Sequence, residues 1–247
     1  MRRLLPLSLV AALVASTSSA SAAGGLFQTL PKDGTWTRYY MEMKSERPMQ
    51  MMTGTFTLRS VGSVTENGEK CRWVEMQMEG ERDGKKEKGA FKFLVKEKDF
   101  KPGSKSVPEI VRGWIQNKAD GEVKELTDQE KSPDGMMVIF FGGHRKDVKK
   151  LKKEKVIDYQ KGQLKITTGT TGTLELKPAP NAPAGFKYTV TQSVWPHKNV
   201  PFGTAAMEVQ MEIKIKDMIA SKMKMTFSVQ DHGTGGEQAK SALPDKK

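Results

Sequence analysis

The stretch Met207–Lys216, MEVQMEIKIK, decides the fold class, because apolar and polar residues alternate in it without a break. Successive side chains of a β-strand point to opposite faces, so this segment predicts a strand with one apolar and one polar face. The runs Lys222–Val229 and Tyr188–Val194 repeat the alternation. Strands of this kind bury one face and leave the other in water, which is typical of an antiparallel sheet.

The N-terminal half carries the same pattern between clear turn signals. Apolar residues alternate with polar ones from residue 35 to residue 59 and again from residue 72 to residue 96. Asn67-Gly68 and Asp83-Gly84 separate these runs, and both dipeptides favour the positive φ angles of tight hairpin turns. The pattern predicts a four-stranded meander with one wet face.

Two segments depart from alternation. Ile110, Val111, Trp114 and Ile115 have i, i+3, i+4 spacing after Pro108, which predicts a helix near 108–117. The continuous apolar run Met136–Phe141 predicts a strand buried on both faces, or one that lies under this helix. The fold class is therefore mainly β: a curved antiparallel sheet, half-barrel or barrel-like, with one or two short helices.

The two ends of the chain read differently from its middle. A basic start, the apolar run Leu4–Val14 and the small residues Ala20-Ser21-Ala22 predict a cleavable signal peptide over 1–22. The run is too short to span a membrane, and no later run is long enough. Residues 23–231 are predicted to form a single β domain, and the Gly-, Lys- and Ser-rich residues 232–247 a disordered tail. The protein is expected in the periplasm or outside the cell.

Charge restricts the partners. The chain carries +12, and +10 remains without Arg2 and Arg3. Because an exported protein rarely meets nucleic acid, we expect no such partner, and a solvated lysine surface explains most of the charge. The segment Arg145–Lys155, if helical, has a thin apolar edge that could rest on an anionic membrane surface, but a solvated connection between strands is the favoured interpretation. The residues proposed for that contact are Lys149, Lys150, Lys152 and Lys153.

Methionine is unusually frequent, with 15 residues in the chain, several of them two positions apart. Residues i and i+2 of a strand share a face, so these pairs would line one surface together with phenylalanine. Three interpretations stay open: an ordinary core, an apolar ligand cavity, and a Cu(I) site built from thioethers. The candidate ligand-lining residues are Met41, Met43, Met76, Met78, Phe91, Phe93, Trp114, Met207, Met211, Met223 and Met225.

Catalytic and metal-binding motifs are not apparent. His144, His197 and His232 lack the sequence context of a nucleophile elbow or a zinc site. The single cysteine, Cys71, forms no intrachain disulfide and is expected to be a small buried residue. We therefore predict no catalytic residue, no cofactor and no metal, although a carboxylate pair assembled by folding would be invisible in the sequence.

The segment Trp195–Gly203, WPHKNVPFG, followed by Met207-Glu208 on a strand, resembles a turn in exported bacterial proteins of the periplasmic lipoprotein-carrier (Lol-type) group. The order of an early meander and then an element that holds Trp114 is also similar. The resemblance implies a half-barrel closed by helical elements, with an acyl chain or other apolar cargo on its concave face and no catalytic residue. The loops at 145–155 and 178–183 depart from that pattern.

These observations predict an exported, non-enzymatic carrier or binding protein for an apolar, lipid-like ligand in the cell envelope. The alternative is a structural or interaction protein of the envelope with a filled core. A Cu(I)-binding protein and an unrecognised hydrolase are further alternatives.

Overall fold

The computed structural model describes residues 25–243 apart from residues 47–48, 83, 101–107, 119–120, 132–137, 143–144, 153, 175, 177–181, 183 and 217. The predicted signal peptide lies outside the described residues. None of the described helices is long and apolar enough to cross a membrane.

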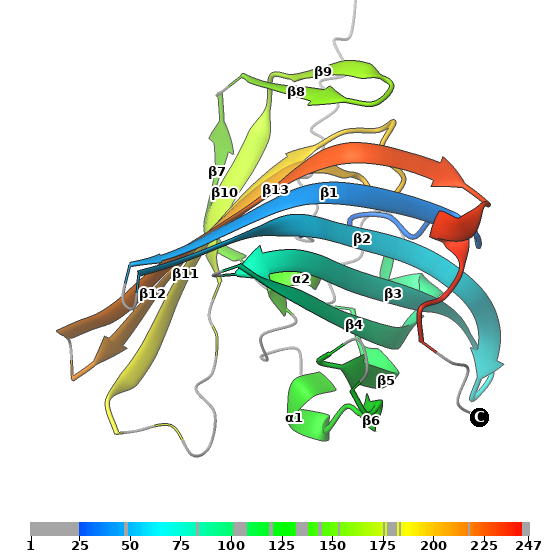
Figure 1. Ribbon diagram of the computed structural model, residues 1–247, viewed down its shortest axis with the longest axis horizontal. Helices are drawn as coiled ribbons and strands as arrows, with labels where there is room; N and C mark the ends of the chain where they lie inside the picture. Colours follow the sequence, from blue (N-terminus) through cyan, green and yellow to red (C-terminus); the bar gives the residue numbers. More distant parts are fainter. Residues whose placement is uncertain are drawn as a thin grey trace, which may run out of the picture.

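The fold is one large, curved antiparallel sheet whose eleven strands have the order β6-β5-β4-β3-β2-β1-β13-β12-β11-β10-β7 (Figure 1). A separate hairpin is formed by β8 and β9. The strands are β1 (Thr35–Glu46), β2 (Met49–Glu66), β3 (Glu69–Arg82), β4 (Lys85–Lys96), β5 (Ile110–Gln116), β6 (Lys124–Glu125), β7 (Arg145–Leu151), β8 (Lys155–Tyr159), β9 (Gly162–Ile166), β10 (Gly169–Leu174), β11 (Phe186–Pro196), β12 (Thr204–Ile215) and β13 (Met218–Thr234). The described part of the sheet is open, which confirms the predicted half-barrel-like class.

The helical elements are short. They are α1 (Asp128–Lys131), α2 (Val138–Phe141) and the 3-10 turns η1 (Glu97–Phe100) and η2 (Glu237–Ala239). The strand predicted over Met136–Phe141 is wrong where it is described, because residues 138–141 form α2 inside the arch of the sheet (Figure 1). This single turn presents Ile139 and Phe141 to the core.

Turn chemistry and close backbone approach shape the sheet. Asn67 and Gly68 form the β2–β3 turn with φ of 50° and 77°, as their sequence predicts. Gly54 and Gly80 face each other across β2 and β3, and a Cβ on Gly80 would lie 2.9 Å from the Thr53 carbonyl oxygen. The two backbones therefore approach more closely here than side chains would allow.

The helix predicted at 108–117 is wrong, because residues 110–116 form β5 next to β4. A register shift between Leu94 and Val95 places an extra β5 residue there. Such a bulge interrupts the period of two, and short apolar runs of this kind fit a helix or a strand equally well.

The disordered tail predicted at 232–247 is also wrong for its described part. Residues 232–234 complete β13, η2 follows, and the Leu243 side chain is 2% exposed. The tail returns over the outer side of β2 and β3 (Figure 1).

The basic stretch at 145–155 is not helical either. Residues 145–151 form the edge strand β7, which pairs with β10. Exposed lysines on an edge strand discourage pairing with other chains, which gives this lysine-rich sequence a structural reason.

Candidate functional site

The two faces of the sheet are named here by their contents. The inner face carries Tyr39, Met41 and Phe56, which belong to the main apolar core, and the outer face carries the residues between them. On the inner face, cross-strand register brings Met52, Met43 and Met225 into one row on β2, β1 and β13. The next row contains Met223 and Met211 on β13 and β12. The predicted methionine-lined face therefore exists across several strands.

Six of the candidate lining residues are fully part of the core. Met41, Met76, Phe93, Met207, Met211 and Met225 are all buried there. Four others, Met43, Met78, Phe91 and Met223, are partly buried and pack against the same core.

Trp114 does not belong to this set. It pairs with Lys92 across β4 and β5, and its ring lies 4.9 Å from that of Trp73. Phe93, by contrast, pairs with Gly113. Trp114 and Phe93 therefore lie on opposite faces, and the predicted lining role of Trp114 is wrong.

Much of the hollow under the sheet is filled by the chain itself. We call this filling the inner plug: residues 25–30, α2 and the loop 197–203. Phe27 lies 4.8 Å from Phe141, 5.4 Å from Phe202 and 6.0 Å from Phe93 between ring centroids. Phe27 and Phe202 are completely buried. Residues 200–203, VPFG, are therefore packed in the core at the centre of the molecule.

Polar groups fix the inner plug in place. The Tyr39 hydroxyl donates to the Thr204 carbonyl at 2.9 Å, and the Thr204 hydroxyl donates to the Gly25 carbonyl at 2.7 Å. Gln192 Nε2 donates to the Ile139 carbonyl at 2.7 Å. Burial raises the pKa of the Tyr39 phenol above its usual value, so Tyr39 acts as a neutral donor.

Beyond the inner plug, the apolar inner face continues but is less covered. Met43, Met223, Tyr188 and Ile213 are partly exposed toward the far ends of β1 and β11–β13, and Tyr188 and Ile213 face each other. Sequence reasoning did not select Tyr188 or Ile213 as lining residues, although both lie on apolar positions of alternating strands. This partly exposed region is the candidate ligand face.

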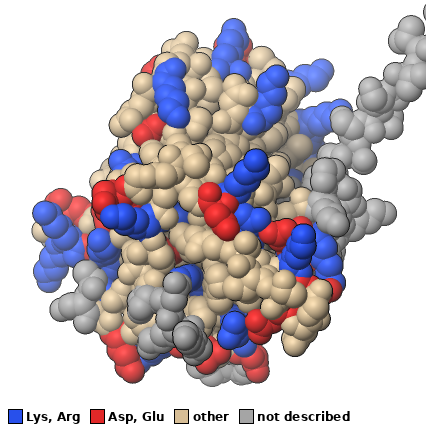
Figure 2. All heavy atoms as spheres, turned by 90° about the vertical axis from the view of Figure 1, so that its right-hand side faces the viewer, with Lys and Arg blue, Asp and Glu red and all other residues tan. Residues whose placement is uncertain are grey.

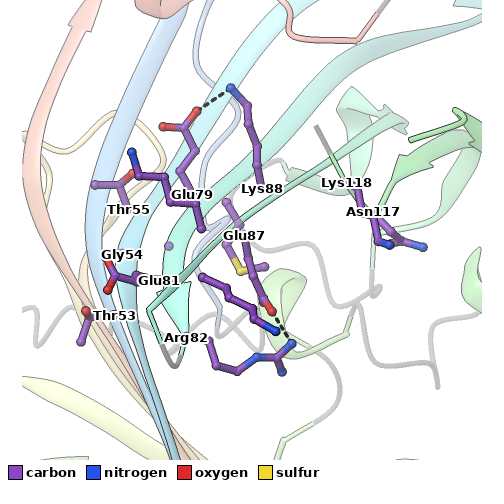
Figure 3. A pocket seen from close by; sticks show the side chains of 14 residues that line it. Thr53, Gly54, Thr55, Glu79, Glu81, Arg82, Glu87, Lys88, Asn117 and Lys118 are labelled. Carbon is purple, nitrogen blue, oxygen red and sulfur yellow. Dashed lines mark hydrogen bonds and ion pairs between the residues drawn. The ribbon is translucent and has the colours of Figure 1, made fainter. Parts of the chain in front are cut away.

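A large groove at the ends of β2–β4 has a different character (Figure 3). Its volume is about 1080 Å³, and Met78 is its one apolar side chain larger than glycine among the described lining residues. Lys88 and Glu79 form an ion pair of 2.7 Å there, and Arg82 pairs with Glu87. A groove lined mostly by charged and polar side chains does not suit an apolar ligand.

A buried charged row lies on the outer face of β2–β4. Arg59, Glu75 and Lys92 are consecutive cross-strand partners, and Glu75 and Lys92 are completely buried. Arg59 Nη1 donates to Glu75 Oε1 at 3.1 Å. Burial lowers the pKa of Arg59, and the charge of Glu75 opposes that shift.

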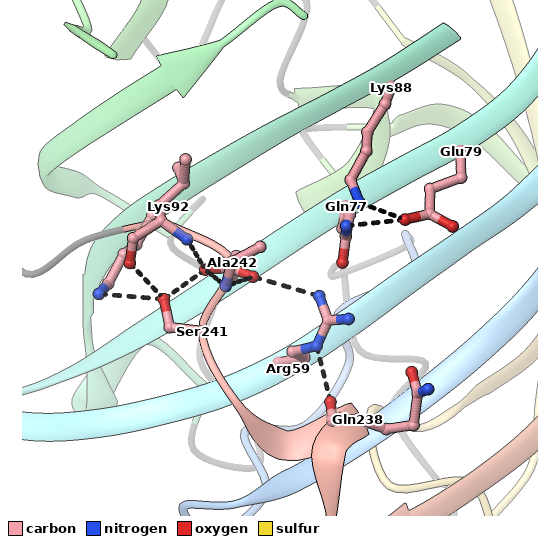
Figure 4. Close-up of polar contacts among 10 residues, drawn as sticks. Arg59, Gln77, Glu79, Lys88, Lys92, Gln238, Ser241 and Ala242 are labelled. Atoms are coloured by element: carbon pink, nitrogen blue, oxygen red, sulfur yellow. Dashed lines mark hydrogen bonds and ion pairs between the residues drawn. The ribbon is translucent and has the colours of Figure 1, made fainter. Parts of the chain in front are cut away.

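The C-terminal tail completes this charged row (Figure 4). Ser241 Oγ lies 2.5 Å from Glu75 Oε2, and the Ala242 and Leu243 amides donate to the Glu75 carboxylate at 2.9 and 3.2 Å. Lys92 Nζ donates to Ser241 Oγ at 3.3 Å. The Ser241 hydroxyl thus connects Lys92 with Glu75, and the tail acts as a clamp over the charged row.

Other reactive groups show no site among the described residues. No group of three or more His, Cys, Asp or Glu side chains that could hold a metal ion occurs in the described part of the chain. Cys71 is 1% exposed, and burial raises the pKa of its thiol. Of the lysines proposed for membrane contact, Lys149, Lys150 and Lys152 are exposed, and Lys153 lies outside the described residues.

Comparisons with known proteins assign no family. No protein-family model matches the chain, and no curated protein matches it. One solved structure that aligns with it is a protein from Lactobacillus plantarum assigned provisionally as an oleoyl thioesterase. The two share 8% identity over 80% of this chain and 78% of the other, with a TM-score of 0.13. A likeness this low carries no argument about fold or activity.

Proposed function

We propose that this chain is an exported, non-enzymatic carrier or binding protein for an apolar, lipid-like ligand in the cell envelope. One observation carries the proposal: the methionine-lined inner face extends beyond the inner plug, and its side chains there remain partly exposed. Apolar side chains that continue a core without being covered are a common place for ligands or partners.

The composition of this face suits a flexible ligand. Met43 and Met223 contribute unbranched thioethers, and Tyr188 and Ile213 add a ring and a branched chain. Methionine side chains adapt to varied apolar shapes at low cost. An acyl chain laid across these strands would bury surface that is now partly in water, which is the driving force for binding.

A fluorescent fatty acid tests the proposal. We expect saturable binding of the polyene probe cis-parinaric acid to the full chain, because its tail can cover the candidate ligand face. Met223→Glu places a carboxylate on that face and should weaken binding roughly ten-fold. Val64→Glu is the matched control, because Val64 is 38% exposed on β2, outside this face, and should leave binding unchanged.

The same titration includes outcomes that count against a carrier. Unchanged binding in both variants would place the probe elsewhere, including on the apolar run Leu4–Val14, which all variants share. Circular dichroism of each variant separates lost binding from lost folding.

The inner plug favours a second candidate, a structural or interaction protein with a filled core. Phe27, Phe141 and Phe202 occupy the centre of the molecule, where a larger half-barrel would hold its cargo. This candidate predicts no saturable binding of the fatty acid at any concentration below its solubility limit.

The row of Met52, Met43 and Met225 supports a Cu(I) hypothesis, because thioethers are soft ligands and these three lie on adjacent strands. Titration with Cu(I) in an anaerobic buffer separates this alternative, and Met43→Leu removes the central sulfur while keeping the apolar shape.

A further inference from the structure

One end of the sheet projects beyond the rest of the molecule. β13 pairs with β1 as far as Met223 and Ser45, but it continues beside β12 to the pair Met218 and Ile215. β11 follows β12 to the same end. We call this projection the distal arm: residues 186–188, 213–215 and 218–222. Five residues of extended strand separate Met223 from Met218, which corresponds to roughly 16 Å. The ends of β12 and β13 accordingly project past the β1–β2 hairpin (Figure 1).

The inner face of the distal arm is mostly apolar, with Ser221 as its polar member on β13. Phe186 pairs with Ile215 and Tyr188 with Ile213, and the two rings lie 4.7 Å apart. These four side chains are only partly buried. The arm therefore carries the apolar inner face outward from the candidate ligand face to its tip.

The tip and its neighbour expose large apolar side chains. Met218 is 72% exposed and Ile219 is 39% exposed. The adjacent β1–β2 hairpin contributes Met49 at 90% and Met51 at 49%. Half of the eight large apolar side chains that are exposed in the described part of the chain thus gather at this end. Clusters of this kind mark contact sites, whereas single exposed apolar residues need no explanation.

The charge around the tip has a definite sign. From residue 212 to residue 224 the sequence has four lysines against two acidic residues, and Lys216, Lys222 and Lys224 are exposed. Glu212 pairs with Lys214 and Lys222, and Glu208 pairs with Lys224, so the excess of positive charge around the tip is small. The opposite end of the molecule carries both signs interspersed over its surface (Figure 2). Exposed apolar residues next to lysines complement a membrane surface that has negatively charged headgroups outside and apolar chains inside.

We infer that the distal arm docks on an anionic lipid bilayer, with Met218 and Ile219 inserted at the boundary of headgroups and acyl chains. Lys214, Lys216 and Lys222 lie within a few residues of the tip, a distance over which headgroup charge is still felt. This surface is distinct from the edge-strand lysines of β7. The inference does not depend on whether the inner face binds a ligand.

A fluorophore at the tip tests the docking directly. Met218→Cys, labelled with the polarity-sensitive dye NBD, should brighten roughly two-fold on vesicles of phosphatidylcholine mixed with phosphatidylglycerol. Val156→Cys on β8 is the matched control, because Val156 is 48% exposed but lies outside both the arm and the segment 145–155, and its dye should not respond. Cys71 is buried and should take no label in the native protein. Treating the unsubstituted chain with the dye verifies this.

The local readout is needed because the apolar run Leu4–Val14 can bind lipid by itself. An unchanged signal at residue 218, or equal signals at 218 and 156, would overturn the inference. Equal response to vesicles of phosphatidylcholine alone would overturn its anionic part. A signal that rises with protein concentration in the absence of vesicles would assign the tip to a second copy of the chain instead.

Co-sedimentation gives a second, label-free measurement. The double variant Met218→Asp and Ile219→Asp should lower vesicle binding roughly ten-fold, because it removes apolar insertion and adds negative charge. Val64→Asp with Val156→Asp exchanges two other exposed apolar residues, which lie outside the arm and outside the segment 145–155, and should bind as the unsubstituted chain does. Loss of binding in both double variants would contradict the docking site.

Discussion

Two rows of side chains lie next to each other on β2–β4, yet they stabilise the protein by opposite means. Leu58, Met76 and Phe91 pair across the strands on the inner face. Arg59, Glu75 and Lys92 form the neighbouring row on the outer face. The first row consists of apolar groups that adapt to one another, and the second consists of charges that need particular partners. Alternation therefore gives one sheet a tolerant face and an intolerant one.

The largest effect should come from removing the central carboxylate. Glu75→Gln removes the carboxylate with which the buried Arg59 pairs and turns one acceptor into a donor facing backbone amides. We expect the free energy of unfolding to fall by about 3–5 kcal/mol. Denaturant unfolding followed by circular dichroism measures it, with Glu79→Gln, an exposed ion-pair residue, as the control.

If Glu75→Gln and Glu79→Gln lose similar, small amounts of stability, the buried charges do not distinguish the two faces. In that case the outer face would be as tolerant as the inner one.

A smaller loss should follow from shortening the tail. A chain that ends at Lys240 lacks the Ser241 hydroxyl, the two amides that bind Glu75, and the buried Leu243 side chain. Water can replace part of these hydrogen bonds once the tail is gone, so we expect a loss of about 2–3 kcal/mol in unfolding free energy. Calorimetry of the shortened chain measures this. A chain shortened only by residues 244–247 serves as the control, and equal melting temperatures for all three chains would contradict the clamp.

The smallest effect should occur on the inner face. Met76 is 1% exposed, but Met76→Leu keeps its volume and apolar character. We expect it to cost less than about 1.5 kcal/mol, whereas Met76→Ala should cost about 2–5 kcal/mol because it leaves a cavity. The pair of variants measured by chemical unfolding sharpens the comparison. A loss for Met76→Leu as large as that for Glu75→Gln would show that the methionine face is rigidly specified after all.

The strands could be predicted from the sequence because one face of most of them is exposed to water, which makes apolar and polar residues alternate. Met207–Lys216 and the Asn67-Gly68 turn could be located correctly, since period-two alternation and positive-φ turn residues are local properties. Residues 110–116 could not, because β5 contains a bulge and is apolar on both faces, which removes the alternation.

The parts of the structure that were missed depend on contacts between distant segments. The tail resembles a disordered segment in composition because it docks chiefly through two backbone amides and one hydroxyl, which leave little trace in a sequence. The inner plug was missed for a related reason: Phe27 and Phe202 are isolated apolar residues in loops, and only the fold brings them together. The methionine face was found from i and i+2 spacing, but its covered and uncovered parts could not be distinguished.

The pairing of β1 with β13 has a consequence for the order of folding. The first strand of the sheet has its second neighbour in the last strand, nearly two hundred residues later in the chain. While the polypeptide is still being synthesised, one edge of β1 has no native partner, and the two halves of the sheet remain unjoined. Contacts of such long sequence separation form slowly, because a large loop must close before they are made. The complete sheet can therefore form only once β13 has been made, and until then the open edge of β1 is a place where aggregation can begin.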